Sequence, residues 1–225
     1  VLEIGPGLGT LTSTLLARSK EVIAVEFDQE LARKLPGQFP GKHLTVHHED
    51  ILRFDLDTLP VGYKVVANVP YYITSKIIER LLTAQNKPSV VVLLIQKEVA
   101  DRIVATPGDM SILAISAQLF ARTSLGPLVP AEYFTPPPKV DSQVVILETL
   151  TTPRIDRNDE RRFFRLIKAG FGAKRKKLRS SLAGGLGISK QDTERLLAHA
   201  GISPDNRAED LSIDDWQRLM KVVDL

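Results

Sequence analysis

A glycine-rich stretch near the start of the chain, EIGPGLGT at residues 3–10, has the residue types of a loop that binds a nucleotide-like ligand. Gly5, Gly7 and Gly9 follow a short apolar run, and glycine allows a tight turn and a close approach of backbone to ligand. Their spacing, G-x-G-x-G, differs from the G-x-G-x-x-G of dinucleotide-binding folds. Glu3 stands just before the glycines, where its carboxylate would repel a pyrophosphate but attract the ammonium group of an amino acid. The loop therefore favours S-adenosylmethionine over NAD, and a purely structural glycine turn is the alternative.

Two acidic residues follow later apolar runs and extend this set of candidate ligands. Glu26 ends one run, 21 residues after Gly5, where a carboxylate can accept hydrogen bonds from both ribose hydroxyls. Asp50 follows the next run, and its carboxylate could accept from an adenine amino group while the backbone N–H of Ile51 meets a ring nitrogen. Alone, each acid would be an ordinary surface residue. The predicted cofactor-binding residues are Glu3, Gly5, Gly7, Glu26, Asp50, Ile51 and Asn68.

The heptapeptide NVPYYIT at 68–74 places an amide, a proline and two tyrosines at the end of a further apolar run. The side-chain oxygen of Asn68 and the backbone carbonyl of Pro70 could each accept one hydrogen of an exocyclic amine, and Tyr71 could stack on a flat base. The lone pair of adenine N6 is delocalised into the ring. Two acceptors that hold its hydrogens would favour a pyramidal nitrogen aimed at a methyl group. The alternative is a turn over buried tyrosines, and Tyr72 fits the core or the surface equally well.

Positive charge gathers in the last third of the chain. Residues 151–225 carry 16 Lys and Arg against 11 Asp and Glu, a net charge of +5, whereas residues 1–150 carry 14 against 16, a net charge of −2. A basic part beside a slightly acidic one indicates a polyanionic partner. The densest cluster of cations comprises Lys174, Arg175, Lys176, Lys177 and Arg179. Such a cluster is typical of contacts with RNA phosphates, and a solvated charged face is the alternative.

These residues need a scaffold, and the pattern of apolar runs predicts an α/β fold. Runs typical of strands alternate with stretches of helical spacing through the first 150 residues. The expected strands cover 1–4, 22–26, 44–48, 64–68, 89–96 and 142–150, and the expected helices cover 10–18, 29–35, 74–82, 97–103 and 111–120. This alternation predicts a mostly parallel, Rossmann-like sheet with helices on both faces and an antiparallel last strand. We expect a cofactor-binding catalytic domain at residues 1–150.

Proline marks a rigid connector within that domain. Five prolines lie between residues 127 and 138, and proline cannot donate to a sheet ladder. The segment therefore predicts a connector between two antiparallel strands. It carries Tyr133 and Phe134, and its stiffness would hold Phe134 near the strand ends.

A small helical domain is expected at residues 151–225, after a linker over 151–159. Helical spacing predicts three helices, at about 159–171, 191–200 and 212–223. The last begins with a capping box formed by Ser212 and Asp215. Its apolar stripe places Trp216 in the core.

The composition excludes several classes of protein. The 225 residues are 43% hydrophobic and 25% charged, which suits a globular chain, and no apolar run approaches the ~20 residues of a membrane helix. The lack of cysteine excludes thiolate metal sites and fits a reducing, cytoplasmic location. The histidines lack zinc-motif spacing, so no metal is expected. Because Val1 begins inside an apolar run, we expect further residues upstream.

Several longer segments carry a resemblance to one family of enzymes. They are EIGPGLGTLT at 3–12, NVPY at 68–71, YFTPPPKVDS at 133–142, KAGFGAKRKKLRSSL at 168–182 and NRAEDLS at 206–212. NVPY matches the N-[LIV]-P-Y signature of RNA adenine N6-dimethyltransferases, with Val69 in place of the usual Leu. From residue 1 to the C-terminus, the chain resembles the bacterial small-subunit rRNA adenine N6-dimethyltransferases.

The resemblance implies a reaction and its participants. Family members dimethylate two adjacent adenosines in the 3′-terminal hairpin loop of small-subunit (16S) rRNA during ribosome biogenesis. They use S-adenosylmethionine, which becomes S-adenosylhomocysteine, and need no metal. By motif match, Tyr71 and Phe134 hold the target base beside Asn68 and Pro70. The implied partner is an assembling small subunit, and the protein is expected to be a monomer. Family members also have an upstream segment that helps enclose the cofactor, so weak cofactor affinity is expected for these 225 residues.

Three other functions remain open. The related large-subunit rRNA adenine methylases of macrolide resistance share the glycine loop and the N-[LIV]-P-Y signature, but the small C-terminal domain and FTPPPKVDS favour the small-subunit enzymes. A non-catalytic RNA-binding assembly factor would not need the intact set at 68–71. An NAD-dependent dehydrogenase conflicts with the glycine spacing.

Overall fold

The computed structural model describes residues 1–223, which form two compact units. The first unit comprises residues 1–101 and 120–151, and the second comprises 102–119 and the chain from 152 onward. Residues 102–119 were predicted to belong to the first domain, but they cluster with the second unit and their backbone is hydrogen-bonded to it. The N–H groups of Gly108 and Met110 donate to the carbonyl of Glu209 at 2.9 and 3.1 Å.

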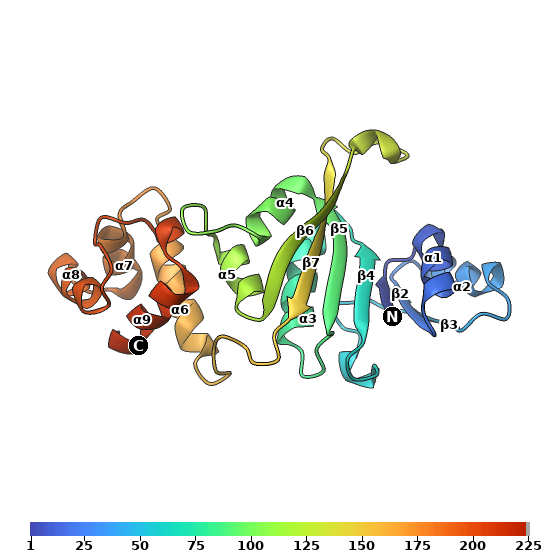
Figure 1. The fold of residues 1–225 in the computed structure, drawn as a ribbon, viewed down its shortest axis with the longest axis horizontal. Coiled ribbons are helices and arrows are strands. Elements are labelled where there is room, and N and C mark those ends of the chain that lie inside the picture. Colours follow the sequence, from blue (N-terminus) through green and yellow to red (C-terminus); the bar gives the residue numbers. More distant parts are fainter. Residues whose placement is uncertain (224–225) are drawn as a thin grey trace. The chain divides into compact units, whose positions relative to one another are not determined.

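A seven-stranded sheet forms the centre of the first unit (Figure 1). Its strands are β1 (Leu2–Ile4), β2 (Val22–Glu26), β3 (Leu44–His48), β4 (Lys64–Asn68), β5 (Val90–Gln96), β6 (Ala121–Val129) and β7 (Ser142–Thr149). The spatial order is β3-β2-β1-β4-β5-β7-β6. Neighbours from β3 to β5 are parallel, whereas β7 runs antiparallel to both β5 and β6. The predicted fold class, with an antiparallel last strand, is confirmed.

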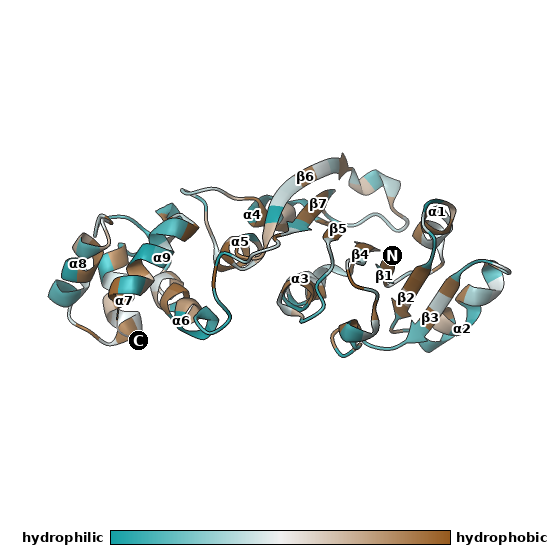
Figure 2. Ribbon diagram, turned by 60° about the horizontal axis from the view of Figure 1, so that its bottom comes forward, coloured by the Kyte–Doolittle hydropathy of each residue, from teal (hydrophilic) through white to brown (hydrophobic). Residues whose placement is uncertain are grey.

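Four α-helices begin in the first unit: α1 (Thr10–Arg18), α2 (Gln29–Gln38), α3 (Thr74–Thr83) and α4 (Lys97–Ile103). Short 3₁₀ helices lie at Leu56–Thr58 (η1), Tyr71–Ile73 (η2) and Ala131–Tyr133 (η3). Strand β2 is largely hydrophobic, whereas α3 carries both hydrophobic and hydrophilic residues (Figure 2). The apolar side of α3 is fully buried, and it comprises Ile77, Ile78, Leu81 and Leu82. This amphipathic helix is confirmed from its predicted spacing.

Two elements continue past prolines that were expected to interrupt them. Helix α2 continues past Pro36 to Gln38 rather than ending before it. Strand β6, which the sequence analysis did not list, continues through Pro127. The pairing of β6 with β7 shifts between Leu125 and Leu128, and an edge strand tolerates proline at such an irregularity. The predicted connector between two antiparallel strands is thus confirmed, but it begins after Val129.

The second unit is helical. It contains α5 (Ile112–Gln118), α6 (Glu160–Phe171), α7 (Leu178–Leu186), α8 (Lys190–His199), η4 (Ala208–Asp210) and α9 (Ile213–Val222). Helix α7 was missed because two glycines and a basic run disguise its spacing. Gly185 belongs there because an added Cβ would lie 2.5 Å from Cα of Ala169 in α6. Trp216 is fully buried, and the capping box of Ser212 and Asp215 is present, as predicted.

Candidate active site

The residues predicted to bind the cofactor and the target base gather at the carboxyl-terminal edge of the sheet, where the parallel strands end. Strand order reverses between β1 and β4, and open α/β sheets bind ligands at this switch point, beyond the carboxyl ends of the strands. The glycine loop follows β1, Glu26 ends β2, Asp50 follows β3 and Asn68 ends β4. Parallel pairing brings these strand ends to the same edge.

The three glycines of the loop have different roles. Gly5, Gly7 and Gly9 have φ of 64°, 56° and 85°, a left-handed conformation that glycine adopts without strain. A Cβ added at Gly9 would lie 2.9 Å from Cδ1 of Leu35 in α2, so this glycine permits close packing. A Cβ added at Gly5 or Gly7 would meet nothing within 4 Å. The backbone at these two residues is open to a ligand.

Glu26 links the end of β2 to the glycine loop. Its side chain is only 7% exposed. Oε2 accepts a hydrogen bond from the N–H of Gly7 at 3.1 Å, and Oε1 accepts from the N–H of Asp28 at 2.9 Å. Each carboxylate oxygen has two lone pairs, so both retain capacity for a hydroxyl donor. The carboxylate is fixed in place and can still accept from a ribose.

Glu3 is a buried acid without a hydrogen-bond partner. Its side chain is 1% exposed, and within the described residues neither carboxylate oxygen is hydrogen-bonded. Burial raises the pKa of Glu3; the nearby Thr12 hydroxyl opposes this shift, and the charge of Glu26 adds to it. Buried carboxylates are normally paired. An unpaired one beside an open glycine loop fits a cationic ligand group, such as the ammonium of S-adenosylmethionine.

The loop after β3 is held by an arginine that the sequence analysis missed. Oδ1 of Asp50 accepts from the N–H of Leu52 at 2.9 Å. Arg80, on α3, donates to the carbonyls of Ile51 at 3.2 Å and Phe54 at 2.5 Å. These bonds fix the turn that presents Asp50 and Ile51. No sequence signal marks Arg80, because its role depends on the packing of α3 against this loop.

The NVPY segment provides one open acceptor and one occupied acceptor. Asn68 is exposed at the end of β4, while Val69 is buried. The Pro70 carbonyl already accepts from the N–H of Ile73 at 3.2 Å and from Oγ1 of Thr74 at 3.4 Å. Both bonds are long for their types. Of the two acceptors, Asn68 is the one left open, whereas the Pro70 carbonyl is already engaged.

The aromatic residues of this segment point to different environments. Tyr71 is half-buried, and its hydroxyl lies 2.8 Å from Oγ of Ser142, which is fully buried at the start of β7. Tyr72 is 85% exposed. Of its two open alternatives, the surface is the one observed.

Phe134 is half-buried in the connector between β6 and β7. Its N–H donates to the carbonyl of Ala131 at 3.1 Å, and the N–H of Ala131 donates to Oδ1 of Asp141 at 3.0 Å. Asp141 directly precedes Ser142, the partner of Tyr71. Phe134 and Tyr71 therefore come from two segments that meet at the start of β7.

A sequence profile described as ribosomal RNA adenine dimethylase matches residues 1–225. The chain belongs to this family. The match covers both units, including the glycine loop, the NVPY segment and the connector with Phe134.

Several bacterial relatives share much of the sequence. Ribosomal RNA small subunit methyltransferase A of Dehalococcoides mccartyi (strain CBDB1) is 45% identical over 223 residues, covering 97% of this chain and 77% of the relative. The protein of that name from Desulfitobacterium hafniense (strain DSM 10664 / DCB-2) is 43% identical over 227 residues, covering 99% of this chain and 81% of the relative.

Two solved structures share the fold of this family member. A dimethyladenosine transferase from Plasmodium falciparum superposes with a TM-score of 0.81 at 27% identity, covering 97% of this chain and 87% of the other. The 23S rRNA methyltransferase ErmE superposes with a TM-score of 0.76 at 26% identity, covering 98% and 89%. One of these two structures is thus named for 23S rRNA, whereas the more similar bacterial relatives carry a small-subunit name.

The basic cluster of this dimethylase-family chain divides into two groups. Lys177 donates to Asp205 at 2.9 Å, and this hydrogen bond lowers the pKa of Asp205. Arg179 pairs with Glu194 at 3.2 Å and with Asp205 at 3.4 Å. The other three cations, Lys174, Arg175 and Lys176, are exposed in the turn before α7. Those three are the ones free to meet a polyanion.

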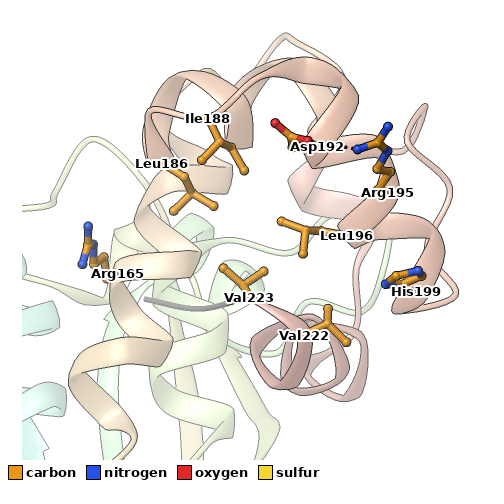
Figure 3. A pocket seen from close by; sticks show the side chains of 9 residues that line it. All are labelled: Arg165, Leu186, Ile188, Asp192, Arg195, Leu196, His199, Val222 and Val223. Atoms are coloured by element: carbon orange, nitrogen blue, oxygen red, sulfur yellow. Dashed lines mark hydrogen bonds and ion pairs between the residues drawn. The ribbon is translucent and has the colours of Figure 1, made fainter.

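The second unit also has a pocket of about 450 Å³. Figure 3 shows its apolar floor with charged side chains around it, including the ion pair of Arg195 and Asp192 at 3.5 Å. None of the predicted site residues lines it. Within residues 1–223, no group of three or more acidic, histidine or cysteine side chains is arranged to hold a metal ion. The described helices also include none that is both long and apolar enough to cross a bilayer.

Proposed function

We propose that this chain transfers methyl groups from S-adenosylmethionine to N6 of two adjacent adenosines in the 3′-terminal hairpin loop of small-subunit rRNA. One observation carries the proposal: an open glycine loop with an unpaired buried carboxylate lies at the same sheet edge as Asn68. The glycine loop and the buried carboxylate of Glu3 suit the methyl donor, and Asn68 suits the accepting amine. Family membership and the small-subunit names of the bacterial relatives support the choice of RNA.

The cofactor side of the site would use residues from three strand ends. Glu3 would pair with the ammonium group, and Gly5 and Gly7 would let the backbone approach the ligand. Glu26 would accept from the ribose hydroxyls. Asp50 would accept from the adenine amino group, and the N–H of Ile51 would donate to a ring nitrogen. When bound, S-adenosylmethionine supplies a methyl group on a sulfonium, a good leaving group.

The base side of the site would orient the accepting nitrogen. The Asn68 side-chain oxygen would accept one N6 hydrogen and turn the lone pair toward the methyl group. The Pro70 carbonyl would accept the other hydrogen, giving up one of its long bonds to Ile73 or Thr74. Tyr71 and Phe134 would stack on the two faces of the base. Alignment of this kind supplies much of the rate of a displacement reaction.

The setting of the reaction follows from the same proposal. The exposed cations Lys174, Arg175 and Lys176 would contact rRNA phosphates. The substrate would be an assembling small subunit, which the protein would meet as a monomer in the cytoplasm.

Methyl incorporation into isolated ribosomal subunits tests the function. Small and large subunits from a strain lacking this protein would be incubated with the chain and saturating, labelled S-adenosylmethionine. We expect label only in small-subunit rRNA, at two adjacent adenosines. Label confined to large-subunit rRNA would contradict the proposal. Asn68→Ala serves as the second arm: if it supports subunit maturation as well as the wild type, RNA binding rather than methylation is the principal role.

A further inference from the structure

Two tyrosine side chains have no role in the site described above, yet both project into solvent beside it. Tyr72 is 85% exposed and Tyr133 is 74% exposed, although large aromatic side chains are usually buried to a considerable degree. Tyr72 follows Tyr71 in η2, and Tyr133 precedes Phe134 at the end of η3. Each proposed base-stacking aromatic therefore has an exposed tyrosine next to it in the chain.

Hydrogen bonds connect the segments that carry these tyrosines. The Tyr71 hydroxyl meets Oγ of Ser142, and Oδ1 of Asp141 accepts from the N–H of Ala131 at 3.0 Å. Asp141 and Ser142 are consecutive, so η2 and η3 are joined through the start of β7. Because β7 is antiparallel to β5, it begins where β5 ends, at the edge that carries Asn68. The two tyrosines thus belong to the edge at which the target base would enter.

We propose that Tyr72 and Tyr133 stack on unpaired bases next to the target adenosine. The inference rests on the proposed function. A base that enters a pocket leaves its own stack, and its neighbours then lose a stacking partner. An exposed aromatic ring offers each neighbour a new partner, whatever its sequence, because every base has a π-face. Where two adjacent adenosines are substrates, rings that hold the flanking bases keep the strand in register for both.

The test measures binding of a labelled RNA hairpin that has the two adenosines in its loop. Matched hairpins carry an abasic site on one side or the other of the adenosine pair. Y72A and Y133A remove a ring, whereas Y72F and Y133F keep it. V61A is the control, because Val61 is 95% exposed but precedes β4, at the opposite edge of the sheet. Methylation of isolated small subunits by the same variants provides a second readout.

Each alanine variant should bind the intact hairpin about 10-fold more weakly, as expected for the loss of one base–aromatic contact. The phenylalanine variants and V61A should stay within about twofold of the wild type, because stacking needs only the ring. With the abasic hairpin that lacks its stacking partner, each alanine variant should bind as well as the wild type. Cofactor affinity and melting temperature should be unchanged, because both side chains project into solvent.

Two results would overturn the inference. One is wild-type affinity of both alanine variants for the intact hairpin. The other is an equal loss on intact and abasic hairpins, which would show that the tyrosines act by some means other than stacking. Failure of the proposed function looks different: the wild type would leave small-subunit rRNA unmethylated, while the binding comparison would still be measurable.

Discussion

The hydroxyl of Tyr71 lies 2.8 Å from the hydroxyl of Ser142, 71 residues further along the chain. Ser142 is fully buried, whereas Tyr71 is half-buried and belongs to the segment that follows β4. One hydrogen bond thus fixes the proposed base-stacking ring to the first residue of the antiparallel strand. It also joins the NVPY segment to the connector that holds Phe134.

Removal of the Tyr71 hydroxyl should affect both stability and catalysis. Y71F leaves the buried Ser142 hydroxyl without its partner, which should lower the free energy of unfolding by about 1–3 kcal/mol. The looser ring should lower kcat on small subunits several-fold and leave cofactor affinity unchanged. The double variant Y71F/S142A should recover part of the stability, because both polar partners are then absent. Denaturant unfolding of the wild type, Y71F, S142A and the double variant completes a double-mutant cycle. Additive losses of stability in the double variant would contradict a direct interaction.

The glycines of the loop should separate into two classes on substitution. G5A and G7A should cost about 1–2 kcal/mol of backbone strain, and their main effect should be weaker S-adenosylmethionine binding. G9A has the same strain and a Cβ 2.9 Å from Leu35, so it should be about 1–3 kcal/mol less stable still. Thermal unfolding and calorimetry measure the two effects. Equal stabilities of G7A and G9A would contradict this division.

Loss of one carboxylate oxygen at Glu26 should weaken the cofactor site. E26Q places an amide NH₂ opposite the N–H of Gly7 or Asp28, so one backbone donor loses its acceptor. We expect at least about 10-fold weaker binding of S-adenosylmethionine, since hydrogen bonds to charged groups contribute about 1.5–3 kcal/mol. E30Q is the matched control. Glu30 forms surface ion pairs with Arg33 and Lys34, and such pairs contribute little to stability. Cofactor affinity that falls equally in both variants would count against the assignment.

The buried acid Glu3 should make both stability and cofactor binding depend on pH. Burial raises the pKa of Glu3 above 4.5 in the folded protein. The contribution of Glu3 to stability is therefore complete at pH values below the pKa that it has in the unfolded chain. That contribution is lost as the pH rises through the raised folded pKa. E3Q should therefore be more stable than the wild type at neutral pH, and the difference should shrink toward pH 4.5. Melting temperatures across this range provide the measurement.

The same variant should bind the cofactor poorly. Pairing with an ammonium group favours ionised Glu3, so wild-type affinity should rise with pH through the raised pKa, whereas the affinity of E3Q should lack this dependence. Calorimetry at several pH values compares the two. An E3Q protein that retains both the affinity and its pH profile would exclude a salt bridge at this position.

The two groups of cations should respond differently to substitution. K174A/R175A/K176A should weaken RNA binding and reduce the slope of log affinity against log salt by about 2, since each lost phosphate contact contributes somewhat less than one unit. The control K177A/R179A removes the partners of Asp205 and Glu194. It should change the slope less, because Lys177 and Arg179 are already paired with acidic side chains of the protein. Anisotropy titrations between 50 and 200 mM salt test the slopes, and identical slopes for the two variants would contradict the division.

Much of the fold could be predicted because its signals are local. Strands at 22–26, 44–48 and 64–68 matched the apolar runs residue for residue, and glycines marked the turn after β1. Strand β6 was missed because Pro127 obscures it, and only its place at the edge of the sheet allows that proline. The membership of residues 102–119 in the second unit was also missed, because it depends on hydrogen bonds to Glu209, about a hundred residues away.

The site was predictable in its residue types but not in its pairings. The sequence could show that Pro70 has a carbonyl and no N–H, but not that Ile73 and Thr74 already use that carbonyl. Arg80 carried no signal, because its bonds to the Asp50 loop arise from the packing of α3. In each case the missing information is tertiary contact, which local propensity does not encode.

The antiparallel placement of β7 has a consequence for the order in which the protein can mature on the ribosome. Strands β1 to β4, which precede or carry the glycine loop, Glu26, Asp50 and Asn68, are complete once residues 1–68 have emerged. The partner of Tyr71 is not synthesised until residue 142. In a nascent chain the proposed cofactor residues are therefore present long before the proposed base-stacking ring of Tyr71 can be fixed to β7. Chain connectivity therefore makes the attachment of Tyr71 to β7 the later of the two steps.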